Sequence, residues 1–229
     1  MGNDFGYIDE NLHIIREKLR EAEDKAGRPA GSVRIMAVTK TVPPEAVNHA
    51  VSLGIDLLGE NRVQEFLSKK DSYDKSAEVH MIGHLQTNKI KYIINDVSMI
   101  QSVDSTRLAA EISRLAVKNG RTIDVLCEVN IGGEDSKSGI APEGLDELLE
   151  TVSHIEGIRL RGLMTIPPPS ESDVFLGRMK ELYDRYSAVY PMDVLSMGMT
   201  HDYEAAARYG STLVRIGTGL FGARVYPQK

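Results

Sequence analysis

Cysteine is almost absent from this sequence, with Cys127 as the single example among 229 residues. One cysteine cannot form a disulfide within the chain, so nothing indicates an oxidising compartment, and we expect a cytoplasmic protein. A basic excess is also lacking, because 27 Lys and Arg face 33 Asp and Glu and leave a net charge of −6. Proteins that bind nucleic acid without sequence preference normally carry such an excess, so we expect no nucleic-acid partner.

Long apolar runs are lacking too. No stretch approaches the ~20 apolar residues of a membrane span, and residues 1–23 are too polar and acidic for a signal peptide. The composition, 41% hydrophobic and 26% charged, is close to that of soluble globular proteins. No segment has the composition of a linker. We therefore expect residues 1–229 to form a single domain with no membrane partner.

Strand-like and helix-like segments alternate along the chain. Residues 8–26 have apolar residues at three- and four-residue steps and predict an amphipathic helix that ends at Gly27. Apolar runs typical of buried strands begin at residues 33, 55, 79, 97, 123, 158, 194 and 213. Helix-like stretches cover 44–53, 62–67, 106–118, 143–152, 173–190 and 202–209. The alternation predicts parallel strands joined by helices.

The number of units favours a closed barrel. Eight strand candidates recur about every 26 residues, since 180 residues from Val33 to Leu213 span seven intervals. Eight such units in ~200–250 residues are what a (β/α)8 TIM barrel contains. A doubly wound dinucleotide-binding sheet would carry G-x-G-x-x-G after its first strand, but residues 39–44 contain no glycine. The predicted fold class is thus α/β, a single (β/α)8 TIM barrel with an extra N-terminal helix.

The ends of the first, seventh and eighth strands carry the most informative residues, because barrel active sites collect at the C-terminal ends of strands. Lys40 follows a buried run and is expected in the barrel mouth, where partial loss of hydration favours the neutral amine of Schiff-base chemistry. Ser196, Gly217 and Thr218 lie in glycine-containing loops that could hold an anion, with a short helix starting near Thr218. A lysine facing a phosphate cup predicts pyridoxal 5′-phosphate.

Other polar motifs remain open or are disfavoured. Asn61 either lines the site or caps the following helix. His80 and His84 lack clustered metal ligands, so we reject a zinc site there. The loop at 132–139 is rich in glycine but lacks the P-loop spacing, and we expect a mobile loop that covers the site.

Several motifs in fixed order resemble one known family. The sequence has AVTK at 37–40, GENRVQE at 59–65, HMIGHLQTNK at 80–89, SVDS at 102–105, GLM at 162–164, LSMGM at 195–199 and RIGTGLFGAR at 215–224. These motifs, spread over nearly the whole chain, are similar to those of the pyridoxal phosphate homeostasis protein family. That resemblance implies a barrel like the N-terminal domain of bacterial alanine racemase.

The resemblance also implies roles for individual residues. Lys40 would hold the cofactor as a Schiff base, Ser196, Gly217 and Thr218 would bind its phosphate, and the backbone of Met199 and Thr200 would assist. Arg215 would approach the pyridine nitrogen and Asn61 would lie near the ring. His84 and Asn88 would lie in a nearby loop.

Two functions follow from this resemblance. The first is a non-enzymatic protein of intracellular PLP homeostasis that buffers the cofactor and delivers it to apo forms of PLP-dependent enzymes. The alternative is a PLP-dependent amino-acid racemase or lyase of alanine racemase type. Arg215 disfavours protonation of the pyridine ring, which makes the ring a weaker electron sink. Racemisation also needs a second acid/base, and Tyr203 or Tyr226 could in principle supply it, but nothing in the sequence places either one at the site. A third hypothesis is a barrel that binds another phosphorylated metabolite. We expect a monomer.

Overall fold

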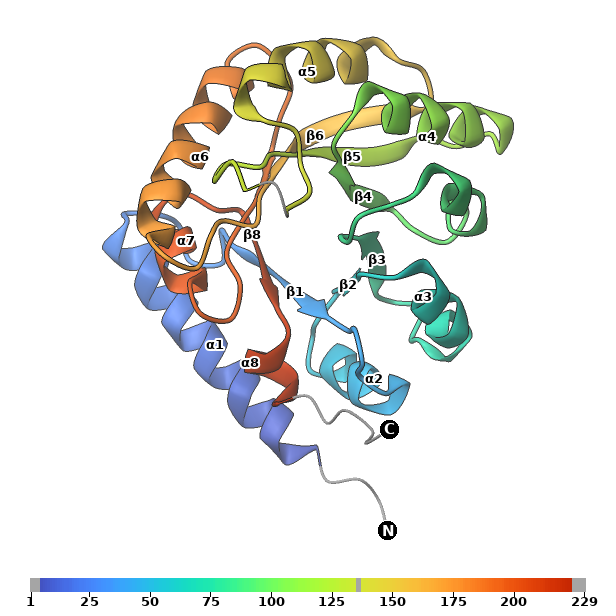
Figure 1. The fold of residues 1–229 in the computed structure, drawn as a ribbon. Helices are drawn as coiled ribbons and strands as arrows, with labels where there is room; N and C mark the ends of the chain where they lie inside the picture. Colours follow the sequence, from blue (N-terminus) through green and yellow to red (C-terminus); the bar gives the residue numbers. More distant parts are fainter. Residues whose placement is uncertain (1–4, 135–136, 224–229) are drawn as a thin grey trace.

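The computed structural model describes residues 5–134 and 137–223. Eight parallel strands follow one another around a closed barrel, and the eighth pairs with the first. The (β/α)8 prediction is therefore confirmed (Figure 1). The strands are β1 (Arg34–Val38), β2 (Leu57–Glu60), β3 (Glu78–Met81), β4 (Met99–Val103), β5 (Ile123–Glu128), β6 (Ile158–Met164), β7 (Val194–Ser196) and β8 (Leu213–Ile216).

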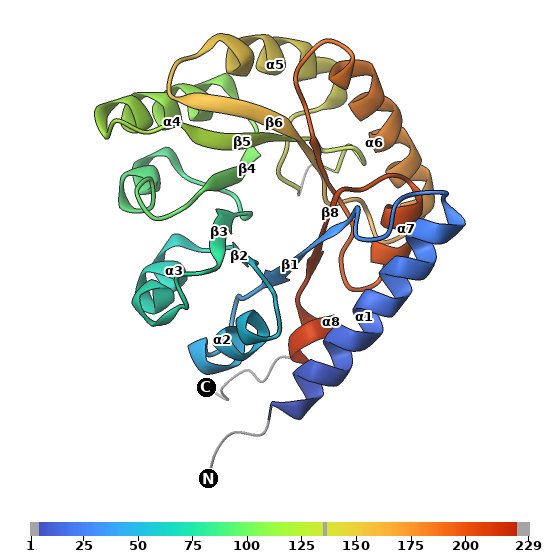
Figure 2. The ribbon, with the colours of Figure 1, turned by 180° about the vertical axis from the view of Figure 1, so that it is seen from behind.

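Helices lie around the outside of the barrel and follow the predicted stretches to within a few residues (Figures 1 and 2). The α-helices are α1 (Gly6–Lys25), α2 (Pro44–Ser52), α3 (Val63–Lys69), α4 (Thr106–Lys118), α5 (Leu145–His154), α6 (Ser172–Ser187), α7 (Tyr203–Arg208) and α8 (Thr218–Phe221). Three 3-10 helices are η1 (Lys70–Ser72), η2 (Thr87–Tyr92) and η3 (Pro142–Gly144). We predicted no helix between β3 and β4, where η2 lies, because Ile90 is the only buried residue of that segment and gives no helical stripe.

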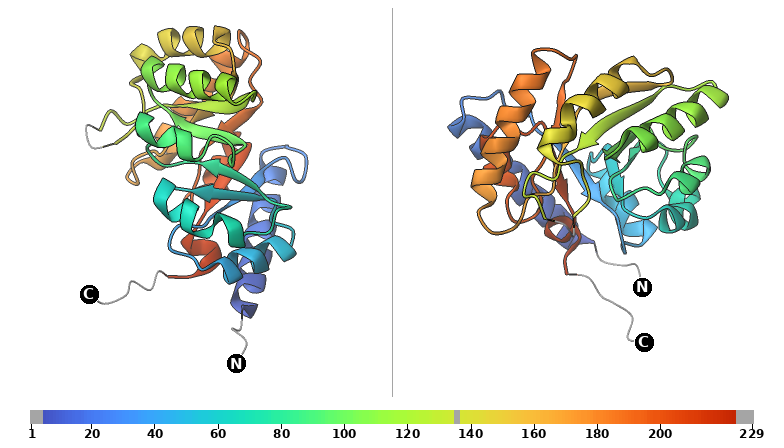
Figure 3. Two further views of the ribbon diagram at one scale, coloured as in Figure 1. Left: turned by 90° about the vertical axis from the view of Figure 1, so that its right-hand side faces the viewer. Right: turned by 45° about the horizontal axis from the view of Figure 1, so that its top comes forward.

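The first helix stands outside the repeating pattern. The apolar stripe predicted for it is buried and comprises Ile8, Leu12, Ile15, Leu19 and Ala22. This stripe packs against α7 and α8, on the side of the molecule away from α4 (Figures 1 and 3). At the end of α1 the buried carboxylate of Glu23 accepts hydrogen bonds from the backbone of Gly31 and Val33, both 2.8 Å long. The helix is thereby fixed to the start of β1.

Buried side chains form an outer layer and a barrel interior. The largest cluster fills the space between the strands and the helices, as alternation along each strand requires. The interior holds smaller apolar clusters, one around Met36 and Leu57 and one around Met99 and Leu126. Within residues 5–134 and 137–223, none of the helices combines the length and apolar character needed to cross a bilayer.

Candidate functional site

A cavity of about 250 Å³ lies at the C-terminal ends of the barrel strands. Barrel active sites collect at this end of the strands, so the residues that line this cavity show which predicted site residues lie together. Seven of the eight predicted residues line it, and Ser196 does not. The full lining consists of Val38, Lys40, Asn61, Ile82, Ile166, Met199, Thr200, His201, Arg215, Gly217 and Thr218.

Lys40 follows β1 between two residues that are tightly held. The amide of Thr39 donates to the carbonyl of Gly59 on β2 at 3.1 Å. On the other side, the amide of Thr41 donates to Glu65 Oε1 at 2.5 Å, and Thr41 has a φ of 64°. A left-handed φ costs free energy for a residue with a Cβ, so this bend is strained and persists because the surrounding contacts hold it. These contacts fix the direction in which Lys40 leaves the strand.

A buried carboxyl supports the same loop from outside the barrel. Glu60 is fully buried and accepts hydrogen bonds from Thr39 Oγ1 at 2.7 Å and from the Tyr73 hydroxyl at 2.5 Å. Burial raises the pKa of Glu60, and burial followed by the charge of Glu60 raises the pKa of Tyr73. The next residue, Asn61, lines the cavity. The N-cap of α3 is Arg62, so Asn61 does not cap that helix.

Arg215 on β8 forms the buried polar floor of the cavity. Its guanidinium donates to the carbonyl of Thr165 and to Ser196 Oγ, both at 2.7 Å. Burial lowers the pKa of Arg215 to about 10, and the charges of Glu128 and Asp202 act in the opposite direction. The side chain therefore stays charged at neutral pH.

Ser196 lies beneath the cavity wall. It is fully buried, accepts from Arg215, and donates to Gln101 Oε1 at 2.8 Å. Its hydroxyl proton is thus engaged within the protein interior. The predicted contact of Ser196 with phosphate stays a prediction, and in this structure its contact with the cavity runs through Arg215.

The loop between β7 and α7 depends on a glycine. Gly198 has a φ of 94°, and a Cβ there would lie 2.5 Å from the Cβ of Ala206. Further along, the amide of Met199 donates to Asp202 Oδ1 at 2.7 Å. The predicted backbone assistance from Met199 would therefore have to displace Asp202, whereas the amide of Thr200 forms no such bond to the Asp202 carboxylate.

Thr200 joins this loop to the loop after β8. Its hydroxyl accepts from the amide of Gly219 at 3.1 Å and lies 3.5 Å from the Thr218 hydroxyl. The short helix predicted near Thr218 is present as α8 and has only four residues. Two loops far apart in sequence thus present hydroxyl groups and glycine backbone to one side of the cavity, as an anion cradle requires.

The histidine pair has separate environments. His80 is buried, with Nδ1 2.9 Å from Gln101 Nε2. His84 is 60% exposed and lies 3.5 Å from Asp104. Neither His84 nor Asn88 is among the cavity-lining residues, so the predicted closeness of both to the site stays a prediction.

Two further predictions fall partly outside the described residues. Asp135 and Ser136 of the 132–139 loop lie there, while Asn130 holds the loop base through its side chain and the backbone of Glu134, at 2.9 and 3.2 Å. Tyr226 is also outside the described residues. Tyr203 belongs to the outer core cluster rather than to the cavity lining, so it does not supply the second acid/base there.

The apolar walls of the cavity were not predicted from the sequence. Val38, Ile82 and Ile166 line it, and His201 completes its rim. Val38 and Ile82 belong to strand-end runs that we treated as core. Alternation from Lys40 and His80 would have placed them facing the barrel axis. Ile166 follows β6, and no local sequence pattern indicates that it faces the cavity.

The fold and the cavity define a class of barrel proteins. A family profile described as the alanine racemase N-terminal domain matches residues 11–225. Alanine racemase from Clostridium difficile has the same fold at 17% identity, with a TM-score of 0.70; the match covers 98% of this chain and 58% of that chain. The protein is thus an alanine racemase-like (β/α)8 barrel.

Within this class, the chain belongs to the pyridoxal phosphate homeostasis protein family. A relative from Aquifex aeolicus with that name is 43% identical over 224 residues, covering 95% of this chain and 98% of the relative. The solved structure of PipY from Synechococcus elongatus PCC7942 with PLP bound is similar at 29% identity and a TM-score of 0.79. That match covers 94% of this chain and all of PipY.

Proposed function

We propose that this protein binds pyridoxal phosphate in the cavity at the barrel mouth and acts in PLP homeostasis by buffering and delivering the cofactor. The observation that carries the proposal is the convergence of Lys40, Arg215 and the Thr200–Thr218 loop pair on one cavity. The PLP-bound structure of PipY supports it. In this proposal apo forms of PLP-dependent enzymes receive the cofactor, and the protein acts as a monomer inside the cell.

The residues present fit this cofactor. A primary amine, a buried cation, apolar walls and two hydroxyl-bearing loops surround one space. Lys40 would form a Schiff base with the aldehyde carbon, with release of one water molecule. Gly217, Thr218 and Thr200 would bind the phosphate. Val38 and Ile82 would pack against the ring.

Bound PLP supplies an electron sink for carbanions at amino-acid carbons. Arg215 opposes that chemistry, because its fixed positive charge disfavours protonation of a nearby ring nitrogen. Among the lining residues within the described parts of the chain, tyrosine is missing, and besides Lys40 and the permanently charged Arg215 only His201 has a side chain of the type used in general acid/base catalysis. We therefore propose binding and transfer of cofactor without a dedicated catalytic activity.

The first test is covalent capture of the cofactor. We expect wild-type protein with added PLP to show a visible absorbance band that borohydride abolishes, with the label on the peptide containing Lys40. Lys40→Ala should give no labelled peptide, whereas Lys25→Ala, an exposed position on α1, should behave as wild type. A wild-type protein that stays colourless with excess PLP would overturn the proposal.

The racemase alternative has its own test. Purified protein with PLP is incubated with each common amino acid, and the enantiomers are separated by chiral chromatography. Saturable turnover that Lys40→Ala abolishes would establish an enzyme and contradict the homeostasis proposal. We expect no saturable turnover.

A further inference from the structure

A line of buried polar side chains crosses the interior of the barrel. It begins at Arg215 on the cavity floor and passes through Ser196 on β7, Gln101 on β4 and His80 on β3. All four residues are at most 3% exposed. Burying polar groups costs free energy unless each is paired, so apolar residues would fill this interior at a lower cost in free energy.

The hydrogen bonds in this line point in one direction. The Arg215 guanidinium only donates, and Ser196 Oγ accepts from it at 2.7 Å. The Ser196 hydroxyl in turn donates a hydrogen bond to Gln101 Oε1 at 2.8 Å. The amide NH2 of Gln101 then donates to His80 Nδ1 at 2.9 Å. This order places the proton of neutral His80 on Nε2.

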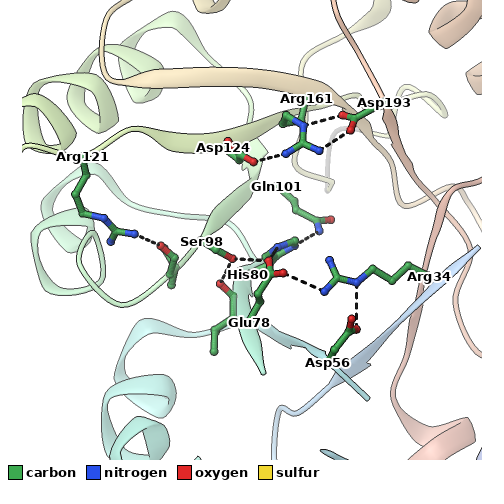
Figure 4. A network of polar contacts seen from close by, with 12 residues as sticks. Arg34, Asp56, Glu78, His80, Ser98, Gln101, Arg121, Asp124, Arg161 and Asp193 are labelled. Carbon is green, nitrogen blue, oxygen red and sulfur yellow. Dashed lines mark hydrogen bonds and ion pairs between the residues drawn. The ribbon is translucent and has the colours of Figure 1, made fainter. Parts of the chain in front are cut away.

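The line ends among charges at the opposite end of the barrel. His80 Nε2 faces Glu78 Oε2 at 3.6 Å, and Arg34 donates to the other oxygen of Glu78 at 3.1 Å (Figure 4). His80, followed by Arg34, lowers the pKa of Glu78 to about 2, so this carboxylate stays charged. The surrounding charges lie around a hollow of about 320 Å³ at the N-terminal ends of the strands, which Arg161 and Asp124 also line.

We propose that Gln101 and His80 are positioning residues that hold the Arg215 guanidinium, through Ser196, at the floor of the cofactor cavity. This inference rests on the proposed function for its effect on PLP. A serine hydroxyl can rotate freely about its C–O bond. Gln101 fixes the Ser196 hydroxyl as a donor toward itself, which leaves its lone pairs for Arg215. His80 fixes Gln101 in turn and thereby sets which end of the amide faces Ser196.

The direction of the line is tested on the wild-type protein without cofactor. Nitrogen-15 NMR of the histidine rings reports which nitrogen carries the proton. We expect neutral His80 with the proton on Nε2 and an unprotonated Nδ1. A proton on Nδ1 would overturn the inference, because His80 could not then accept from Gln101.

The positioning role is tested with Gln101→Leu, which removes both bonds of the amide. We expect the Arg215 side-chain NMR signals to show faster rotation, PLP affinity to fall roughly three- to tenfold, and the visible band of bound PLP to shift. The matched control is Ser102→Ala on the same strand, a fully buried hydroxyl without a partner among the described residues, which should leave all three readouts unchanged.

His80→Phe keeps a ring of similar size and removes the acceptor Nδ1 together with the Nε2–H group that faces Glu78. It should change the same readouts in the same direction, and the double variant should show less than the sum of the two effects. This variant also decides the matter if Gln101→Leu does not fold. Wild-type Arg215 signals, affinity and band in both variants would overturn the inference. A wild type that binds no PLP would instead overturn the proposed function, and the Arg215 signals would then decide the positioning role alone.

Discussion

Glu128 is a residue whose charge the surrounding structure opposes. It ends β5, is 4% exposed, and its Oε2 has no hydrogen-bond partner among the described residues. Burial, followed by the charge of Asp104, raises the pKa of Glu128 from 4.5 to about 7, while Arg215 acts in the opposite direction. A carboxyl in this setting is protonated more readily in the folded than in the unfolded chain.

This difference predicts the pH dependence of stability at Glu128. Between pH 4.5 and 7 the unfolded chain loses this proton before the folded chain does, so the contribution of Glu128 to stability falls as pH rises through that window. Glu128→Gln should remove the decline and stabilise the protein by about 2–3 kcal/mol above pH 7, with little change near pH 4.

Urea unfolding at a series of pH values measures the effect of Glu128→Gln. The exposed position Glu147 on α5 provides the control, since Glu147→Gln should follow the wild-type curve. Parallel curves for Glu128→Gln and wild type from pH 4 to 8 would contradict the prediction.

At the scale of elements, the loop between β7 and α7 carries the strictest backbone requirement near the cavity. Gly198 combines a φ of 94° with a backbone so close to α7 that a Cβ would overlap with Ala206. Met199 and Thr200, which line the cavity, follow directly. The backbone of this loop therefore sets where the Thr200 hydroxyl meets α8.

Gly198→Ala should combine conformational strain with overpacking. We expect a loss of about 2–5 kcal/mol in the free energy of unfolding, together with weaker PLP binding. Gly27→Ala separates the two effects, because Gly27 has a φ of 65° and nothing within 4 Å of a Cβ. That variant should lose only about 1 kcal/mol and keep its PLP affinity. Equal losses in both variants would show that the contact with α7 has no effect.

At the scale of the whole molecule, α1 links the two ends of the chain. Its stripe packs on α7 and α8, and Asn11 Nδ2 donates to the carbonyl of Leu220 in α8 at 3.1 Å. Because α8 begins at Thr218 in the proposed phosphate site, α1 supports that site from behind. We propose that the chain, with α1 included, is one domain.

Leu12→Ala tests that arrangement. Leu12 is 2% exposed, so its truncation should cost about 2–4 kcal/mol, and circular dichroism and PLP release should report a single shared transition. Ile14 on the same helix is 48% exposed, and Ile14→Ala should change stability by less than about 0.5 kcal/mol. An early transition confined to α1, with PLP still bound, would show that α1 is a separate unit.

The sequence by itself determined the barrel and most of the cavity lining. Strand-end residues such as Lys40, Gly217 and Thr218 could be predicted because parallel strands bring their C-terminal ends together whatever the details of packing. The strand-end pattern left Asn61 open, and Arg215 was expected near the cofactor only from the family resemblance. Local patterns also located α1, because its stripe is amphipathic.

The tertiary structure alone decided which polar groups meet inside the barrel. Ser196, Gln101 and His80 come from three different strands, and Ser196 and Gln101, which share a hydrogen bond, are 95 residues apart in sequence. No local sequence pattern encodes such a contact. It depends on strand register and on the side of each strand that faces the axis, both set by closure of the barrel. For that reason Ser196 could be placed at the end of its strand from sequence, but its engagement with Gln101 and Arg215 could not.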